Sequence, residues 1–274
     1  MSLDVGLALR EGVNRTATRN GVIFLSVFFL LGVLNSVLID SMLLWLDSLA
    51  AGLDEVDPIA PETGPLAVSM SGSVIVMLGL LSFIVTAAAS VITIRTMVSS
   101  HTRRIPDELL SHRLTAATVN DLVGNLVAGA LIVVGLLFLV IPGIFLAIGF
   151  YFLRPFIAVE DENFVDALVS SWNLSKGNRI EIFVLWLVVI VVTVVFAIPG
   201  MVLEFSTAAY APTIDAFLTP ALTALTTVFA LTVTARAYVQ LRPGADDDAE
   251  ADESDDPESD DDDEEWPDPP GLDI

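Results

Sequence analysis

Apolar residues dominate this chain in long runs, separated by shorter segments that carry most of its charged side chains. Several runs approach about 20 residues, the length that an α-helix needs to cross about 30 Å of hydrocarbon. They lack the polar face that a helix on the surface of a soluble domain would show. We therefore expect an all-α polytopic membrane protein with six transmembrane helices paired as three hairpins. The predicted spans are residues 22–46, 66–94, 122–141, 143–157, 180–198 and 213–238.

The third and fourth runs are joined by an Ile-Pro-Gly sequence at 141–143. Residues 122–157 as one helix would reach about 54 Å, which exceeds the thickness of a bilayer. Pro142 lacks a backbone N–H and Gly143 has little helix preference, so we expect the helix to break there and the chain to turn back. The returning run is short, which makes a re-entrant loop the alternative and leaves open whether this run spans fully. A second Ile-Pro-Gly, at 198–200, is expected to end the fifth span.

Two segments that precede apolar runs, residues 1–20 and 164–175, have apolar residues at helical spacing. This pattern is typical of helices in the membrane interface, and the arginines of the first segment are expected to face lipid headgroups. The two faces align when Val5 is placed on Phe164, and residues 105–117 occupy the same place before the central hairpin. The chain is thus interpreted as three units of interfacial helix plus hairpin, or as similar helices without a repeat. The two faces are Val5, Ala8, Leu9, Gly12, Val13 and Thr16, and Phe164, Ala167, Leu168, Ser171, Trp172 and Ser175.

All basic residues fall on one side of the membrane when six spans are drawn with the N-terminus inside. Cytoplasmic loops of membrane proteins carry an excess of Lys and Arg, so this pattern predicts cytoplasmic N- and C-termini, and five or seven spans would break it. We expect a multi-pass protein of the cell (plasma) membrane. The 12 basic residues are Arg10, Arg15, Arg19, Arg95, Arg103, Arg104, Arg113, Arg154, Lys176, Arg179, Arg236 and Arg242.

The net charge of −23 is concentrated at the C-terminal end, which holds nearly half of the 35 acidic residues. This low-complexity stretch has too little apolar surface to offset its ordering entropy, so we expect it to be disordered. An acidic chain with a single lysine is typical of adaptation to high salt, where charges are screened within about 3 Å at 1 M, and suggests a halophilic source. The expected organisation is an interfacial helix at 1–20, a six-helix transmembrane domain at 21–242 and a disordered acidic cytoplasmic tail at 243–274.

Hydroxyl, amide and small side chains recur at helical spacing on the second, third and sixth predicted spans. Such faces let helices approach closely and hydrogen-bond to one another, which is the packing interpretation. The functional interpretation is a polar path between these helices. Its candidate residues are Thr86, Ser90, Asp121, Asn125, Thr223 and Thr227.

Ionisable residues in membrane spans are costly and are functional candidates by default. Those of this chain lie near the predicted span ends, where they are interpreted as interface anchors. A buried pair of Asp121 with Arg154 or Arg236 is the alternative. The turn that opens the fifth span would also suit a lipid phosphate, because helix N-termini favour anions, although a plain turn needs no ligand. Candidates for a lipid-phosphate or structural role are Arg154, Trp172, Lys176, Asn178 and Arg179.

The sequence offers no set of residues for catalysis, for a metal or for a cofactor. It contains no Cys, which excludes thiolate nucleophiles and Cys-ligated metal sites. His101 and His112 flank arginines, with no carboxylate cluster at ligand spacing. No phosphate-binding loop or dinucleotide fingerprint is present. We therefore expect a protein that is not an enzyme.

Residues 154–178 contain the pattern R-P-F-I-A-V-E, followed by A-L-x-S-S-W-N-L-S-K-G-N. Together with the Ile-Pro-Gly at 141–143, this pattern resembles the membrane domain found beside bacterial glycerophosphoryl diester phosphodiesterases, and a haloarchaeal integral-membrane domain of unknown function. The resemblance covers residues 120–240 and implies a six-helix, all-α membrane domain. The phosphodiesterase activity of that family belongs to a separate soluble barrel, for which this chain has no room, so no catalytic residue is carried over. The resemblance implies architectural roles for Arg154, Pro155, Ala167, Ser171, Trp172, Lys176, Gly177 and Asn178.

These patterns favour a non-enzymatic membrane scaffold or a protein that binds lipid or a partner. Membrane lipids are the expected partners, a protein in the membrane is a second candidate, and nucleic acid is not expected. The alternative is a small-solute transporter or permease that uses the Thr and Ser face. The ligand, the oligomeric state and the role of the acidic tail are not fixed by the sequence.

Overall fold

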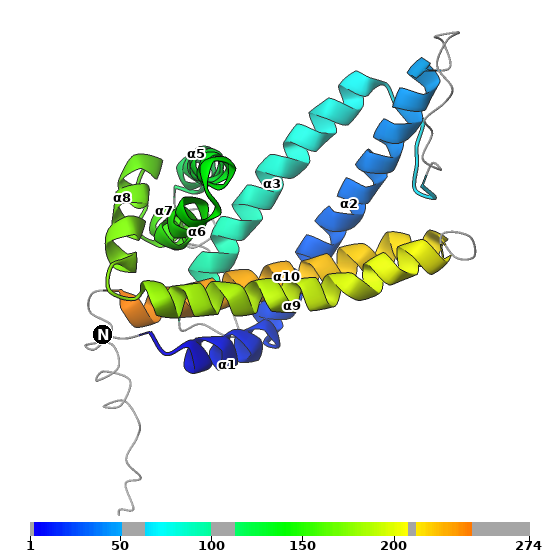
Figure 1. Cartoon of the computed structure of the whole chain (residues 1–274). Coiled ribbons are helices and arrows are strands. Elements are labelled where there is room, and N and C mark those ends of the chain that lie inside the picture. The colour runs from blue at the N-terminus through cyan, green and yellow to red at the C-terminus, as the bar shows by residue number, and fades with distance from the viewer. Residues whose placement is uncertain (1–2, 51–63, 100–112, 208–211, 243–274) are drawn as a thin grey trace, which may run out of the picture. The chain divides into compact units, whose positions relative to one another are not determined.

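The computed structural model describes residues 3–50, 64–99, 113–207 and 212–242 (Figure 1). The predicted acidic tail at 243–274, the loop that holds His101 and His112, and most of the predicted amphipathic segment 105–117 lie outside the described residues. Residues 1–241 form one compact unit, to which all the helices belong.

Every regular element in the described part of the chain is an α-helix, so the predicted all-α class is confirmed. The helices are α1 (Val5–Thr16), α2 (Arg19–Ala50), α3 (Gly72–Val98), α5 (Leu114–Phe138), α6 (Val140–Gly149), α7 (Leu153–Val159), α8 (Phe164–Ser175), α9 (Arg179–Thr207) and α10 (Pro212–Leu241).

Six stretches of these helices are long and apolar enough to cross a membrane, as predicted. Large apolar side chains on them face outward: Leu30, Leu126 and Ile180 are 65, 74 and 77% exposed. Contiguous apolar surface of this kind is stable against lipid chains and unfavourable against water. The six stretches are Arg19–Ala50, Gly72–Val98, Leu114–Phe138, Val140–Val159, Arg179–Ile198 and Ala216–Leu241.

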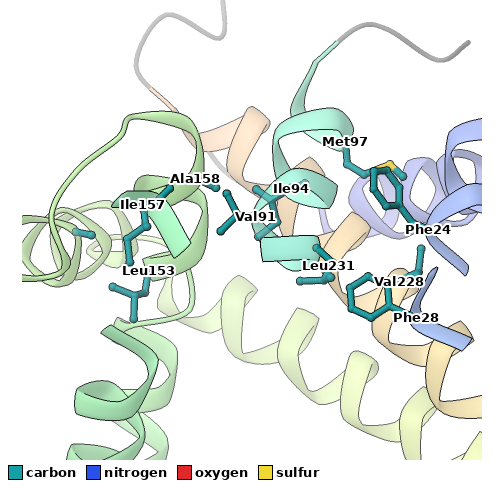
Figure 2. Packing of buried hydrophobic residues seen from close by; sticks show 14 of the residues in the cluster. Phe24, Phe28, Val91, Ile94, Met97, Leu153, Ile157, Ala158, Val228 and Leu231 are labelled. Carbon is teal, nitrogen blue, oxygen red and sulfur yellow. The ribbon is translucent and has the colours of Figure 1, made fainter. Parts of the chain in front are cut away.

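The spans pair as three hairpins: α2 with α3, α5 with α6, and α9 with α10. The second leg of the first hairpin, α3, also contacts α7 and α10, so the three returning legs meet. Their side chains share one apolar cluster, which Figure 2 shows from close by. Because lipid chains are as apolar as these residues, close packing rather than exclusion of water stabilises such a contact. The labelled members from the three legs are Val91, Ile94 and Met97, Leu153, Ile157 and Ala158, and Val228 and Leu231.

The helices α1 and α8 correspond to each other position by position, which bears out the sequence alignment of Val5 with Phe164. Both have 12 residues, and Asp4 and Asn163 cap them by accepting hydrogen bonds from backbone N–H groups of the first turn. The same three positions are buried in each helix. These are Ala8, Gly12 and Thr16 in α1, and Ala167, Ser171 and Ser175 in α8.

The buried faces of these two helices cover protein. The α1 helix packs on α10, where a Cβ on Gly12 would lie 3.3 Å from the Cα of Val233. In α8, Ser171 Oγ donates to the carbonyl of Gly149 at 2.9 Å and accepts from the N–H of Phe152 at 3.1 Å. Each interfacial helix therefore packs on the returning leg of a hairpin other than its own.

The predicted break at Pro142-Gly143 is wrong by a few residues. The non-helical residue is Leu139, with φ −158° and ψ 134°, and Pro142 lies in the first turn of α6. The first N–H groups of a helix have no partner inside it, so proline fits there without loss, and Pro155 occupies the same place in α7. The returning leg then covers Val140–Val159 and is interrupted between α6 and α7, instead of running from 143 to 157.

The second Ile-Pro-Gly, at 198–200, does not end its helix, because α9 continues to Thr207. A proline inside a membrane helix removes a single hydrogen bond, and membrane helices tolerate this where neighbouring groups compensate. The same motif thus starts a helix in one hairpin and lies within a helix in another.

Candidate functional site

The six residues of the predicted polar face line two clefts on either side of α3. One cleft, of about 430 Å³, lies between α3, α5 and α7 and is here called the Arg154 cleft. The other, of about 340 Å³, lies between α2, α3 and α10 and is here called the Asn35 cleft. Thr86 lines both clefts. Ser90, Asp121 and Asn125 line the Arg154 cleft, and Thr223 and Thr227 line the Asn35 cleft.

A charged pair lies in the Arg154 cleft. The Nε atom of Arg154 is 3.4 Å from Oδ1 of Asp121 and donates to Oδ1 of Asn125 at 3.1 Å. Asn125 Nδ2 in turn donates to Asp121 Oδ1 at 2.7 Å. The buried pair that the sequence left as the alternative is therefore formed, with Arg154 as the partner of Asp121. The other candidate, Arg236, pairs with Glu11 instead.

The two charges of this pair differ in exposure. The Asp121 side chain is 2% exposed, whereas that of Arg154 is 37% exposed. A buried carboxylate needs a partner, because an uncompensated charge in a low-dielectric environment is costly. Arg154 supplies that partner, and its side chain lines the cleft and stays partly exposed, which suits a group that also binds an anion.

The hydroxyl groups on α3 bond to their own helix. Thr86 Oγ1 donates to the carbonyl of Ser82 at 2.8 Å, and Ser90 Oγ donates to the carbonyl of Thr86 at 2.9 Å. This bond, one turn back, satisfies a hydroxyl without a second helix. The predicted hydrogen bonding between helices through this face is therefore not formed by these two residues, and their oxygens keep acceptor capacity toward the clefts.

The other four lipid-phosphate candidates lie around the turn between α8 and α9. The Arg179 guanidinium lies 4.1 Å from the ring centroid of Phe145 and 4.8 Å from that of Trp172. Lys176 Nζ is exposed and donates to Asn173 Oδ1 at 2.8 Å. Asn178 contributes its backbone carbonyl, which accepts from the N–H of Ile182 at 2.9 Å. Arg179 and Trp172 therefore stabilise packing by a cation–π contact.

Several polar contacts that join helix ends were not predicted from the sequence. Arg15 Nη1, expected to face headgroups, donates to the carbonyls of Met97 and Ser99 at 3.2 and 2.5 Å. A cation at the C-terminus of a helix is favoured by the helix dipole. Burial lowers the pKa of Arg15, and the nearby positive charge of Arg236 adds to this effect.

Arg95 and Tyr238 bind the segment that follows α7. Arg95 Nη2 lies 2.8 Å from Asp161 Oδ1, and Tyr238 Oη donates to Glu160 Oε1 at 2.7 Å. These pairs are far apart in the sequence. One pattern in the sequence could have drawn attention to these residues. Near the end of each returning leg, an arginine is followed two residues later by Met, Phe or Tyr, at Arg95, Arg154 and Arg236.

Within the described ranges, no group of three His, Asp or Glu side chains is placed to hold a metal ion. The helices, their lipid-compatible surface and the two clefts between them define an all-α, multi-pass membrane protein. The chain belongs to the DUF7847 family, a domain of unknown function, which matches residues 3–241. No curated protein and no solved structure matches the chain.

Proposed function

We propose that this protein is a non-enzymatic membrane protein that binds an anionic lipid in the Arg154 cleft. The observation that carries the proposal is the partly exposed side chain of Arg154, whose Nε is held by Asn125 and Asp121. A guanidinium fixed in this way is suited to a phosphate group, to which it donates in a planar fork.

The rim of the cleft favours an amphipathic ligand over a free anion. Phe83 and Leu126 line the cleft and are 63 and 74% exposed. In a membrane span, apolar side chains with this exposure contact acyl chains. A ligand with an anionic head at Arg154 and apolar chains along Phe83 and Leu126 matches both parts of the surface.

The proposed orientation places the Arg154 cleft toward the cytoplasmic leaflet, because the basic residues gather at that side of the six spans. Anionic lipids enrich cytoplasmic leaflets and attract basic side chains near the surface. A protein partner in the membrane is the second class of ligand.

Lipid binding in the Arg154 cleft is inferred from the cleft alone. The resemblance to the membrane domain beside glycerophosphoryl diester phosphodiesterases and a halophilic source remain predictions from the sequence.

Native mass spectrometry of the full chain, released from nanodiscs that contain phosphatidylglycerol and phosphatidylcholine, tests the proposal. The double variant Asp121→Asn/Arg154→Gln removes both charges, so that no buried charge is left alone. We expect it to retain about tenfold less phosphatidylglycerol than the wild type, because the loss of one charge-assisted hydrogen bond weakens binding by about that factor. Lys176→Gln, which removes an exposed charge outside the cleft, is the control and should change nothing. Equal retention by the double variant and the wild type would contradict the proposal.

The Asn35 cleft favours a second candidate function, a permease for a small neutral solute. Asn35 lies near the middle of α2, and its amide lines a cleft shared with Thr223 and Thr227. An amide in the middle of a membrane span is costly unless it has a polar partner. Uptake of neutral polar solutes into proteoliposomes, reduced by Asn35→Leu, would support this function. Absence of flux for every solute class would exclude it.

A further inference from the structure

The corner between α5 and α6 is apolar throughout. No polar or charged side chain occurs from Leu126 to Phe150. At the corner, Leu137, Phe138 and Ile141 are 80, 81 and 80% exposed. The corner of the first hairpin differs, because it carries polar side chains. Ser71 and Ser73 lie there, at the start of α3, and Arg95 lies at the other end of that helix. A corner that faced water would expose an unbroken apolar surface.

The backbone of this corner is suited to hydrocarbon. Only Leu139 leaves the helical conformation, and its N–H donates to the carbonyl of Gly135 at 3.0 Å. Gly135 and Gly143 allow the legs to touch, since a Cβ on Gly135 would lie 2.9 Å from the Cα of Gly143. Pro142 has no N–H to leave open. Irregular loops exposed to lipid are excluded because their backbone groups find no partner, and a one-residue corner leaves few such groups.

The outgoing leg of this hairpin is shorter than those of the other two. An asparagine marks a comparable level on each outgoing leg. Asn20 and Asn178 lie at the start of α2 and α9, and Asn120 lies in the second turn of α5, where its Oδ1 accepts from the N–H of Phe164 at the start of α8 at 3.3 Å. From these residues, α2 reaches Ala50 in about 45 Å and α9 reaches Thr207 in about 44 Å at 1.5 Å per residue. Measured from Asn120, α5 reaches Phe138 in about 27 Å, less than the roughly 30 Å of a hydrocarbon core, whereas the whole helix from Leu114 is about 36 Å long.

The returning legs give the same result from an independent reference. Each returning leg has an arginine near its end, from which its length can be measured. These residues are Arg95, Arg154 and Arg236. The distance back to the start of the leg is about 35 Å for α3 and about 36 Å for α10. For the middle hairpin, from Arg154 back to Val140, it is at most about 21 Å. Both legs are therefore short by roughly two to three turns.

We propose that the α5–α6 hairpin ends inside the membrane, with residues 136–141 in contact with lipid acyl chains of the far leaflet. The one-sided distribution of basic residues agrees with this arrangement, because a hairpin that ends within the bilayer returns to the side from which it entered. The protein then presents an apolar wedge to the far leaflet and no loop to water at this point.

Single cysteines test the proposal, because the natural chain contains none. Phe138→Cys and Ile141→Cys replace exposed corner residues that pack little against the protein. Ser71→Cys, at the start of α3, is the matched control at the end of a full-length hairpin. A membrane-impermeant maleimide is applied to intact cells and to permeabilised cells. We expect both corner cysteines to react at least tenfold more slowly than the control in either preparation, and to react fully after solubilisation in SDS.

A second measurement separates burial in lipid from burial in protein. Each variant is labelled with bimane in detergent and reconstituted with lipids brominated on their acyl chains. Bimane at the corner positions should be quenched several-fold more than bimane at residue 71. Reaction of either corner cysteine as fast as that of the control, or quenching no stronger than at residue 71, would overturn the proposal.

Discussion

Arginine side chains in this protein are bound in chemically different ways. Arg15 donates to backbone carbonyls at the end of α3, Arg154 pairs with a carboxylate, and Arg179 lies over aromatic rings. A planar guanidinium with several donors serves all three arrangements, whereas the compact ammonium of lysine does not. The near absence of lysine therefore has a structural reason at these three positions, in addition to any adaptation to salt.

The Asp121–Arg154 pair predicts a non-additive effect on stability. Arg154→Gln leaves the buried carboxylate of Asp121 without its cation, which we expect to lower the free energy of unfolding by about 1–3 kcal/mol, since Arg154 is only partly buried. The double variant with Asp121→Asn should recover most of this loss. Thermal unfolding in detergent measures both changes. A double variant less stable than Arg154→Gln would show that the pair is not coupled.

Glu162 predicts a pH dependence. Burial raises the pKa of its carboxyl above the ordinary value of 4.5, and the nearby acids Asp166 and Glu160 add to this effect. Folding therefore takes up a proton, so the stability that this group contributes is present below the ordinary pKa and is lost as the pH rises through the raised pKa. Glu162→Gln should flatten the dependence of the unfolding midpoint on pH just above 4.5. An unchanged slope would contradict the assignment.

At the scale of elements, the corner between α5 and α6 shows what the local sequence determines and what it does not. The presence of a hairpin followed from the length of the apolar stretch and from Pro142 with Gly143. The position of the corner did not, because proline is compatible with the first turn of a helix as well as with a break. Contact between Gly135 and Gly143 closes the corner, and this contact depends on both legs.

Two glycines of α5 provide a matched test of this contact. A Cβ on Gly135 would meet the backbone of Gly143, whereas a Cβ on Gly129 would meet nothing within 4 Å. Gly135→Ala should therefore lower the free energy of unfolding by about 1–3 kcal/mol through overpacking. Gly129→Ala should raise it by up to about 1 kcal/mol, because alanine favours the helix. Thermal unfolding of the two variants side by side measures the difference, and equal effects would contradict the close approach.

At the scale of the whole molecule, the six spans followed from apolar length, and the correspondence of α1 with α8 followed from the match of Val5 with Phe164. The candidate polar residues were found, but their division between two clefts was not, because it depends on the contacts of α3 with α5, α7 and α10. The ion pairs that join Arg95 to Asp161 and Arg236 to Glu11 were also missed. A single sequence does not specify which charges far apart in the chain become neighbours.

The proposed topology predicts which positions share a side of the membrane. Arg10→Cys places an exposed thiol on α1 and Lys176→Cys places one directly after α8, each ahead of an outgoing leg, so both should react with an impermeant maleimide from the cytoplasmic side only. Ser71→Cys should react from the opposite side only. Intact cells and inside-out vesicles provide the two measurements. Labelling of residues 10 and 176 from different sides would exclude an even number of crossings between them.

The packing of α1 on α10 constrains the order of events during synthesis. The helix α1 docks on α10, which follows it by about 200 residues in the chain, with Gly12 against Val233, and α2 also contacts α10. The face of α1 that contacts α10 therefore stays uncovered until α10 has been translated and inserted. A nascent chain that stops before α10 leaves α1 and α2 without the helix that each contacts most, and we expect such a product to be degraded by membrane quality-control proteases.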